Sequence, residues 1–321
     1  MSKFTSFLTP HIESFIRYRK ASGNWNDFYE IIMHRFDKYC AKSYPTESTL
    51  TQRMVDTWCK QRGTEKNNTC RTRSFAIVAL VRYLKARGKT NVEPPTLPRE
   101  EPVTYIPHTF TDAELANFFD ACDNLPAHTG KFYSVLKKII VPVFFRLLYS
   151  SGIRTVEARL LCVDDVDLQH GIISIKVSKG QDQHYVALHD SMTKLLRQYD
   201  EAVKELCPNR KYFFPTGGGK HRTQRWVADT FKELWNQSNH SKTRAYDLRH
   251  HYAVTNINNW ICSGFDFDDK LMYLSKSMGH RDVESTKYYY SLVPGFADIL
   301  EEQTNTDFDD IVPEVDYEKI R

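Results

Sequence analysis

A proline-rich segment at residues 91–108 limits the fold more than any other feature of this sequence, because it separates two long stretches of regular apolar periodicity. Residues 1–90 carry apolar side chains at helical spacing. A chain of 321 residues also exceeds one ordinary domain. We therefore predict a helical domain at 1–90, a linker at 91–108, a second domain at 109–300 and an acidic tail at 301–321.

Apolar spacing predicts helices in both domains and one small sheet in the second. The periodicity changes to strict alternation between residues 163 and 188, with turns at 169–171 and 179–182, which is typical of three short antiparallel strands. Helical patterns cover residues 4–16, 28–39, 50–58, 69–87, 132–150, 192–206, 224–235, 244–260, 268–278 and 284–291, and a capping box at 111–114 starts another helix. The expected fold is mainly α with a small antiparallel three-stranded sheet, in two domains.

Composition excludes several classes of protein. Apolar residues make up 41% and charged residues 26% of the chain, so it is neither disordered nor a coiled coil. No apolar run approaches the roughly 18 residues that a membrane helix needs, and no secretory signal is visible. The seven cysteines lack the spacing of a disulfide framework or a zinc site. We expect a cytoplasmic protein with no metal and no cofactor.

Charge is distributed unevenly along the chain. Residues 1–110 carry 18 lysines and arginines against 10 acidic residues, whereas the last 21 residues carry 2 against 8. A basic front segment suggests a polyanionic partner. The candidates for contact with it lie on or near the longest front helix: Arg71, Arg73, Arg82 and Lys85. It is at least as consistent with the sequence that these side chains are simply solvated and bind no partner.

Five short motifs follow one another in the second domain. They are Ile153-Arg154-Thr155 at a helix–turn–helix corner, Ser178-Lys179-Gly180 on a turn of the sheet, Tyr246-Asp247-Leu248-Arg249 at the start of a helix, Met278-Gly279-His280 at the end of another, and Tyr289 nine residues later. In order and spacing this series resembles the tyrosine recombinase (phage integrase) family, over residues 111–300 for the catalytic domain. Residues 1–90 resemble the family's helical core-binding domain.

The chemistry of phosphodiester cleavage without a metal accounts for these residue types. Charge on the non-bridging oxygens must be neutralised, and guanidinium forks such as those of Arg154 and Arg249 match phosphate oxygens. A nucleophile is also needed, and Tyr289 can supply a phenolate only where cations and an acceptor favour it, since a free tyrosine titrates near pH ~10. Attack by Tyr289 would give a covalent 3′-phosphotyrosine link.

The resemblance implies further roles. Lys179 would be the general acid for the leaving 5′ oxygen, His280 would hydrogen-bond a phosphate oxygen, and Glu157 would orient the region around Arg154. Tyr246 departs from the family pattern His-x-x-Arg, and a phenol cannot act as a near-neutral base as an imidazole does. Which group accepts the proton of Tyr289 is therefore open.

Taken singly, most of these residues have simpler interpretations. Arg154 could be an arginine at a helix end, Lys179 a turn lysine and His280 an ordinary C-terminal helix residue, and a run of tyrosines such as 288–290 is more often a packing surface. Their joint occurrence in the family's order favours catalysis.

The resulting prediction is a DNA-associated site-specific recombinase (integrase) of a mobile element that acts on double-stranded DNA as a homotetramer. Accessory proteins that set direction are conceivable partners, and the acidic tail suits docking on a neighbouring protomer. Two alternatives stay open: relaxation of DNA like a type IB topoisomerase, and a non-catalytic DNA-binding protein derived from an integrase.

Overall fold

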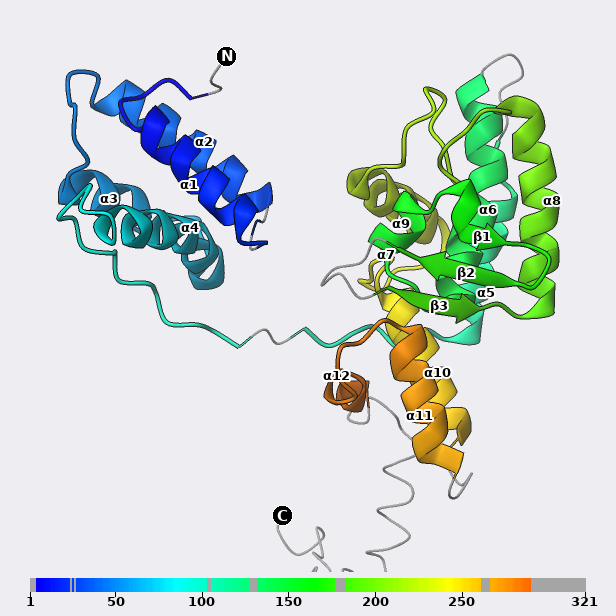
Figure 1. Cartoon of the computed structure of the whole chain (residues 1–321). Coiled ribbons are helices and arrows are strands. Elements are labelled where there is room, and N and C mark those ends of the chain that lie inside the picture. Colours follow the sequence, from blue (N-terminus) through cyan, green and yellow to red (C-terminus); the bar gives the residue numbers. More distant parts are fainter. Residues whose placement is uncertain are drawn as a thin grey trace, which may run out of the picture. The chain divides into compact units, whose positions relative to one another are not determined.

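The computed structural model describes residues 4–23, 25, 27–102, 105–126, 132–176, 183–260 and 266–289. The chain divides into two compact units, one up to Tyr105 and one from Ile106 (Figure 1). The described residues are mainly helical, with one antiparallel sheet of three strands, as predicted. None of the helices within these ranges is long and apolar enough to cross a membrane.

The first unit consists of helices that pack around a single core. They are α1 (Thr9–Ala21), α2 (Asp27–Ser43), α3 (Gln52–Cys59) and α4 (Asn67–Lys85). Each corresponds to one of the four apolar sets in the sequence. Thr51 starts α3 by accepting a hydrogen bond from the backbone N–H of Met54. The central element is α4, which packs against each of the other three helices.

Arg73 corrects one expectation for this unit, because its side chain points into the protein. The residue is only 4% exposed, and its guanidinium donates to both carboxylate oxygens of Glu65, at 2.8 and 2.7 Å. It also donates to the backbone carbonyls of Trp58 and Lys60. Arg73 therefore connects the end of α3 to α4 and cannot contact DNA. The sequence shows that a cation lies in the first turns of the helix, but it does not show that the side chain is buried.

The second unit contains the sheet and eight α-helices within the described ranges. In chain order these elements are α5 (Asp112–Asp123), α6 (Phe132–Ser151), α7 (Thr155–Leu160), the 3-10 turn η1 (Val163–Asp165), β1 (Val166–Asp167), β2 (Ile172–Ile175), β3 (His184–Ala187), α8 (Asp190–Leu206), α9 (Gln224–Ser238), α10 (Asp247–Trp260), α11 (Asp266–Ser277) and α12 (Glu284–Lys287). The predicted capping box of α5 is present, with Thr111 and Glu114 bonding each other's backbone N–H groups.

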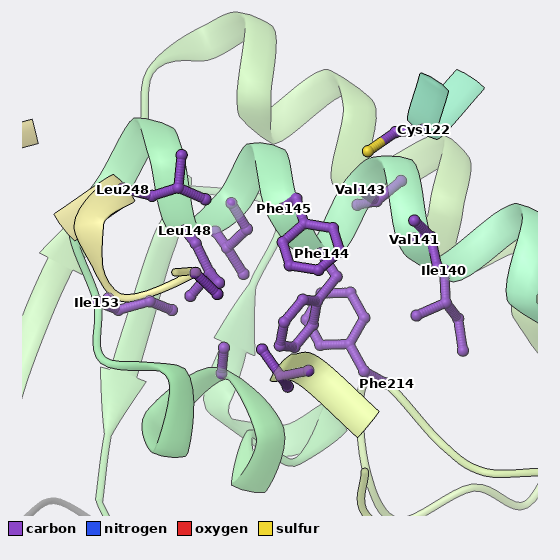
Figure 2. Packing of buried hydrophobic residues seen from close by; sticks show 14 of the residues in the cluster. Cys122, Ile140, Val141, Val143, Phe144, Phe145, Leu148, Ile153, Phe214 and Leu248 are labelled. Carbon is purple, nitrogen blue, oxygen red and sulfur yellow. The ribbon is translucent and has the colours of Figure 1, made fainter. Parts of the chain in front are cut away.

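Helix α6 forms the centre of the second unit. Its side chains Phe144, Phe145 and Leu148 are buried, and Figure 2 shows them beside Phe214 and Leu248, which come from distant parts of the chain. Helices α5, α8 and α10 all pack against α6. The loop that follows α6 is thereby held against the start of α10.

The sheet has the order β1-β2-β3, and both pairs are antiparallel. Ile173 pairs with Val166 on one side and with Val186 on the other. Ile173, Ile175 and Val186 point into the core, in agreement with the alternation seen in the sequence. The turn between β2 and β3, which carries Lys179, lies outside the described residues.

A separate apolar cluster joins α10 and α11. It contains Ile257 of α10, Leu271 and Leu274 of α11, and Met278 just beyond α11. Tyr289 is also part of this cluster, so the tyrosine nine residues after His280 is packed inside the unit rather than exposed.

Because removal of one partner leaves a buried charge uncompensated, we expect Arg73→Met to lower the free energy of unfolding by about 3 kcal/mol. The double variant Glu65→Met/Arg73→Met removes both charges and should recover most of this loss. Arg82→Met, on the exposed side of the same helix, is the matched control and should change little. Urea unfolding of the full chain, followed by circular dichroism, measures all three; equal effects of Arg73→Met and Arg82→Met would contradict the assignment.

Candidate active site

Arg249 lies at the centre of the candidate site, in the first turn of α10. It is 2% exposed, and its guanidinium connects two loops. Nη1 donates to the carbonyl of Gly152, after α6, and Nη2 donates to the carbonyl of Met278, after α11, both at 2.7 Å. Nη2 also lies 2.9 Å from Nε2 of His280. One buried cation thus contacts segments 97 residues before it and 29 residues after it in the sequence.

The two loops that Arg249 connects both turn at a glycine. Gly152 and Gly279 have φ values of +64° and +63°, which favour glycine. A Cβ on Gly152 would lie 2.3 Å from the ring of Tyr252, and a Cβ on Gly279 would lie 2.4 Å from the ring of His184 and 3.0 Å from Nη1 of Arg154. Both turns therefore need glycine for space as well as for conformation.

Arg154 is held at the start of α7 by Glu157. The Glu157 carboxylate accepts from Nη1 of Arg154 at 2.6 Å and from the Arg154 backbone N–H at 2.8 Å. Nη2 of Arg154 donates to the carbonyl of Gly279 at 2.8 Å. Glu157 is 2% exposed, so this carboxylate fixes the direction of the guanidinium from inside the protein. Burial lowers the pKa of Arg249, and the charge of Arg154 lowers it further.

His280 is neutral in this arrangement. Arginine only donates, so Nε2 of His280 accepts from Arg249, and the ring proton is on Nδ1, which donates to Oγ1 of Thr286 at 2.7 Å. Burial and the charges of Arg249 and Arg154 lower the pKa of His280 to about 4. Thr286, on α12, is fully buried. Only its position between His280 and Tyr289 could have pointed to Thr286 in the sequence.

Tyr289 is packed between two imidazole rings. Its ring centroid lies 6.3 Å from that of His280, nearly parallel, and 5.7 Å from that of His250. Burial raises the pKa of Tyr289 to about 12, although the charge of Arg249 opposes this shift. At neutral pH the phenol is therefore protonated, and it is shielded from solvent.

Tyr246 lies immediately before α10, and its backbone carbonyl accepts from the N–H of Arg249 at 3.1 Å. Its ring is 5.1 Å from that of His250, one helical turn later. The structure therefore brings Arg154, Glu157, Tyr246, Arg249, His280 and Tyr289 to one place.

Lys179 lies outside the described residues. The lysine that precedes it in the sequence, Lys176, forms an ion pair with Asp165 at 2.6 Å, which raises the pKa of Lys176. Lys176 is thus already engaged by a carboxylate. Within the described ranges, no group of three or more histidine, cysteine or acidic side chains could hold a metal ion.

The cations expected to bind DNA lie on or near α4 in the other unit. Arg71 pairs with Glu100 at 3.3 Å and donates to the carbonyl of Pro98, and Lys85 pairs with Glu93. Arg82 is exposed. In contrast to Arg73, these three side chains remain near the surface.

Comparison with known proteins shows the family of this chain. The sequence profile described as the phage integrase family matches residues 109–294. The chain belongs to the phage integrase family. Among its relatives are two putative integrase/recombinases of Sinorhizobium fredii: y4rE, 27% identical over 60% of this chain and 62% of that protein, and y4rB, 24% identical over 76% and 81%. The tyrosine recombinase XerC of Lactobacillus delbrueckii subsp. bulgaricus is 21% identical over 86% and 92%.

Solved structures show the same fold. XerH site-specific recombinase, crystallised with its palindromic difH substrate, has a TM-score of 0.59 at 18% identity, covering 87% of this chain and 78% of that one. A lambda integrase dimer bound to a COC′ core site has a TM-score of 0.58 at 13% identity, covering 87% and 94%.

Gly279→Ala should lower the free energy of unfolding by about 2 kcal/mol more than Gly219→Ala, since overpacking adds to the conformational cost. Gly219 has a similar φ of +73° but open space around it, and is therefore the matched control. Thermal unfolding of the two variants measures the difference. Identical losses would mean that the His184 ring moves aside without cost.

The depressed pKa of His280 predicts a pH dependence of stability. Between pH ~6.5, where a histidine titrates in the unfolded chain, and about 4, its pKa in the fold, the unfolded state binds the extra proton. Stability should fall as the pH is lowered through this range. His280→Gln should make the dependence shallower, whereas His240→Gln, at an exposed position, should leave it unchanged. Melting temperatures between pH 4.5 and 7.5 test this.

Proposed function

We propose that this chain is a site-specific DNA recombinase that cleaves and rejoins strands through a covalent 3′-phosphotyrosine link at Tyr289. The observation that carries the proposal is the convergence of Arg154, Arg249, His280 and Tyr289 in one site, although they come from separate segments. Family membership supports the same reaction class.

The arrangement suits a phosphodiester. Two permanent cations lie side by side and are oriented by backbone carbonyls and by Glu157, so little reorganisation is needed when a phosphate enters. A phosphate beside Arg249 would also compete with Nε2 of His280 for the hydrogen bond that the Arg249 guanidinium donates. His280 would then donate to a phosphate oxygen once Nε2 carries a proton, which the negative charge of the phosphate favours.

In the proposed reaction the Tyr289 oxygen attacks phosphorus and the bond from phosphorus to the 5′ oxygen breaks. Lys179 donates a proton to that leaving oxygen. Rejoining reverses these events: a 5′ hydroxyl attacks the phosphotyrosine, and the tyrosine leaves. The bond energy is retained in the covalent link, so the reaction needs no cofactor.

Double-stranded DNA is the proposed partner, with residues 1–90 as a core-binding domain that contacts phosphates through Arg71, Arg82 and Lys85. The solved relatives support both DNA binding and assembly into an oligomer, since one of them is a lambda integrase tetramer bound to a Holliday junction. We propose a tetramer on DNA for this chain. Docking of the tail at 301–321 on a neighbour belongs to the same proposal, and these residues lie outside the described ranges.

Capture of a covalent protein–DNA adduct tests the reaction. Nicked duplexes with random flanking sequence would be incubated with the protein, and DNA that survives denaturing washes would be recovered and sequenced. We expect adducts with the native chain and none with Tyr289→Phe. Tyr288→Phe, which changes the more exposed neighbouring phenol, should retain them.

The same preparation separates the alternatives. DNA binding without any adduct would favour the non-catalytic protein. Relaxation of a supercoiled plasmid that contains none of the recovered sequences would favour the topoisomerase-like activity.

A further inference from the structure

Cleavage by Tyr289 requires a group that takes the phenolic proton, and most polar groups around the site are unsuitable. Arg154 and Arg249 only donate. The Glu157 carboxylate is engaged twice by Arg154. His280 uses both ring nitrogens, Nε2 for Arg249 and Nδ1 for Thr286.

The imidazole of His250 is in ring contact with Tyr289. His250 is the fourth residue of α10, directly after Arg249, and its ring lies against those of Tyr289 and Tyr246, with centroids 5.7 and 5.1 Å away. Its Nδ1 is buried, and no hydrogen-bonding partner for it is found in the described part of the chain. A buried ring nitrogen without a partner is uncommon, and here it belongs to a ring in contact with the nucleophile.

We propose that His250 accepts the proton of Tyr289 during DNA cleavage. The inference rests on the proposed recombinase activity and deepens it, because it assigns the step that the phenol at Tyr246 leaves open. His250 follows Tyr246 by one helical turn, and its imidazole contacts the ring of Tyr289.

The step balances within the site. The Tyr289 O–H bond breaks as its oxygen bonds to phosphorus, and the proton moves to the lone pair of His250. The leaving 5′ oxygen receives a different proton, from Lys179. On rejoining, His250 returns its proton to the departing Tyr289 oxygen and Lys179 takes one from the attacking 5′ hydroxyl.

Electrostatics around His250 suit an acceptor that is neutral before DNA binds. Burial lowers its pKa to about 4; Arg244 and Arg249 lower it as well, and Asp247 opposes them. The other titratable rings in contact are those of Tyr246, Tyr288 and Tyr289. An entering phosphate would offset the two arginine charges, which makes the imidazolium easier to form.

The test measures single-turnover adduct formation on a sequence recovered by the capture experiment. His250→Gln should slow adduct formation about a hundredfold, and Tyr246→His/His250→Gln should restore most of the rate because it supplies an imidazole one turn earlier. His251→Gln is the matched control, since His251 stacks on Tyr149, away from Tyr289, and should cleave normally. DNA affinity and melting temperature of each variant are recorded alongside.

A second substrate distinguishes proton acceptance from other roles. When sulfur replaces the scissile 5′ oxygen, the leaving group no longer needs a proton from an acid. The rate of adduct formation by Lys179→Ala should therefore recover on this substrate, whereas the rate of His250→Gln should stay low. Recovery of His250→Gln on this substrate, or an unchanged rate on the ordinary one, would overturn the inference and leave the recombinase proposal intact. If the rate of Tyr246→His/His250→Gln does not recover on the ordinary substrate, His250 has a packing role and the inference is wrong. Absence of adducts with the native chain would instead overturn the proposed function itself.

Discussion

The guanidinium of Arg249 is the interaction on which the site depends. It is buried, and its bonds to the carbonyls of Gly152 and Met278 hold the end of α6 and the end of α11 against the start of α10. Burying an arginine is unfavourable unless its donors are satisfied. The two carbonyls supply that compensation for Nη1 and Nη2, whereas the buried Nε has no partner among the described residues. The same bonds place Arg154 and His280 beside Arg249.

The same contacts determine the protonation states of the rings around Arg249. Tyr289 is a protonated phenol with a raised pKa, and both adjacent histidines are neutral because burial and the arginines lower their pKa values. A phosphate placed between Arg154 and Arg249 would oppose the lowered pKa values of the two histidines, but it would also offset the arginine charge that lowers the pKa of Tyr289. In the proposed reaction, substrate binding would therefore make the neighbouring imidazoles better proton acceptors.

Much of this fold was predictable from the sequence. The period-two segment gave the three strands, and helical spacing located the helices, since both depend on local patterns of burial. The order of the motifs also indicated which residues meet. Burial of Arg73 was not predictable, because it depends on Glu65 and two carbonyls brought near by the turn between α3 and α4. Thr286 and the orphaned nitrogen of His250 could likewise be found only from tertiary packing.

The ion pairs on and near α4 have a consequence for target search. Glu93 and Glu100, from the segment after the helix, occupy Lys85 and Arg71 as built-in counterions. Exposed pairs of this kind are weak, so DNA can displace them. If Arg71 and Lys85 make the proposed phosphate contacts, DNA of any sequence must compete with these two carboxylates. The protein would then spend less time on irrelevant DNA, and a site with additional favourable contacts would stand out more clearly against the genome.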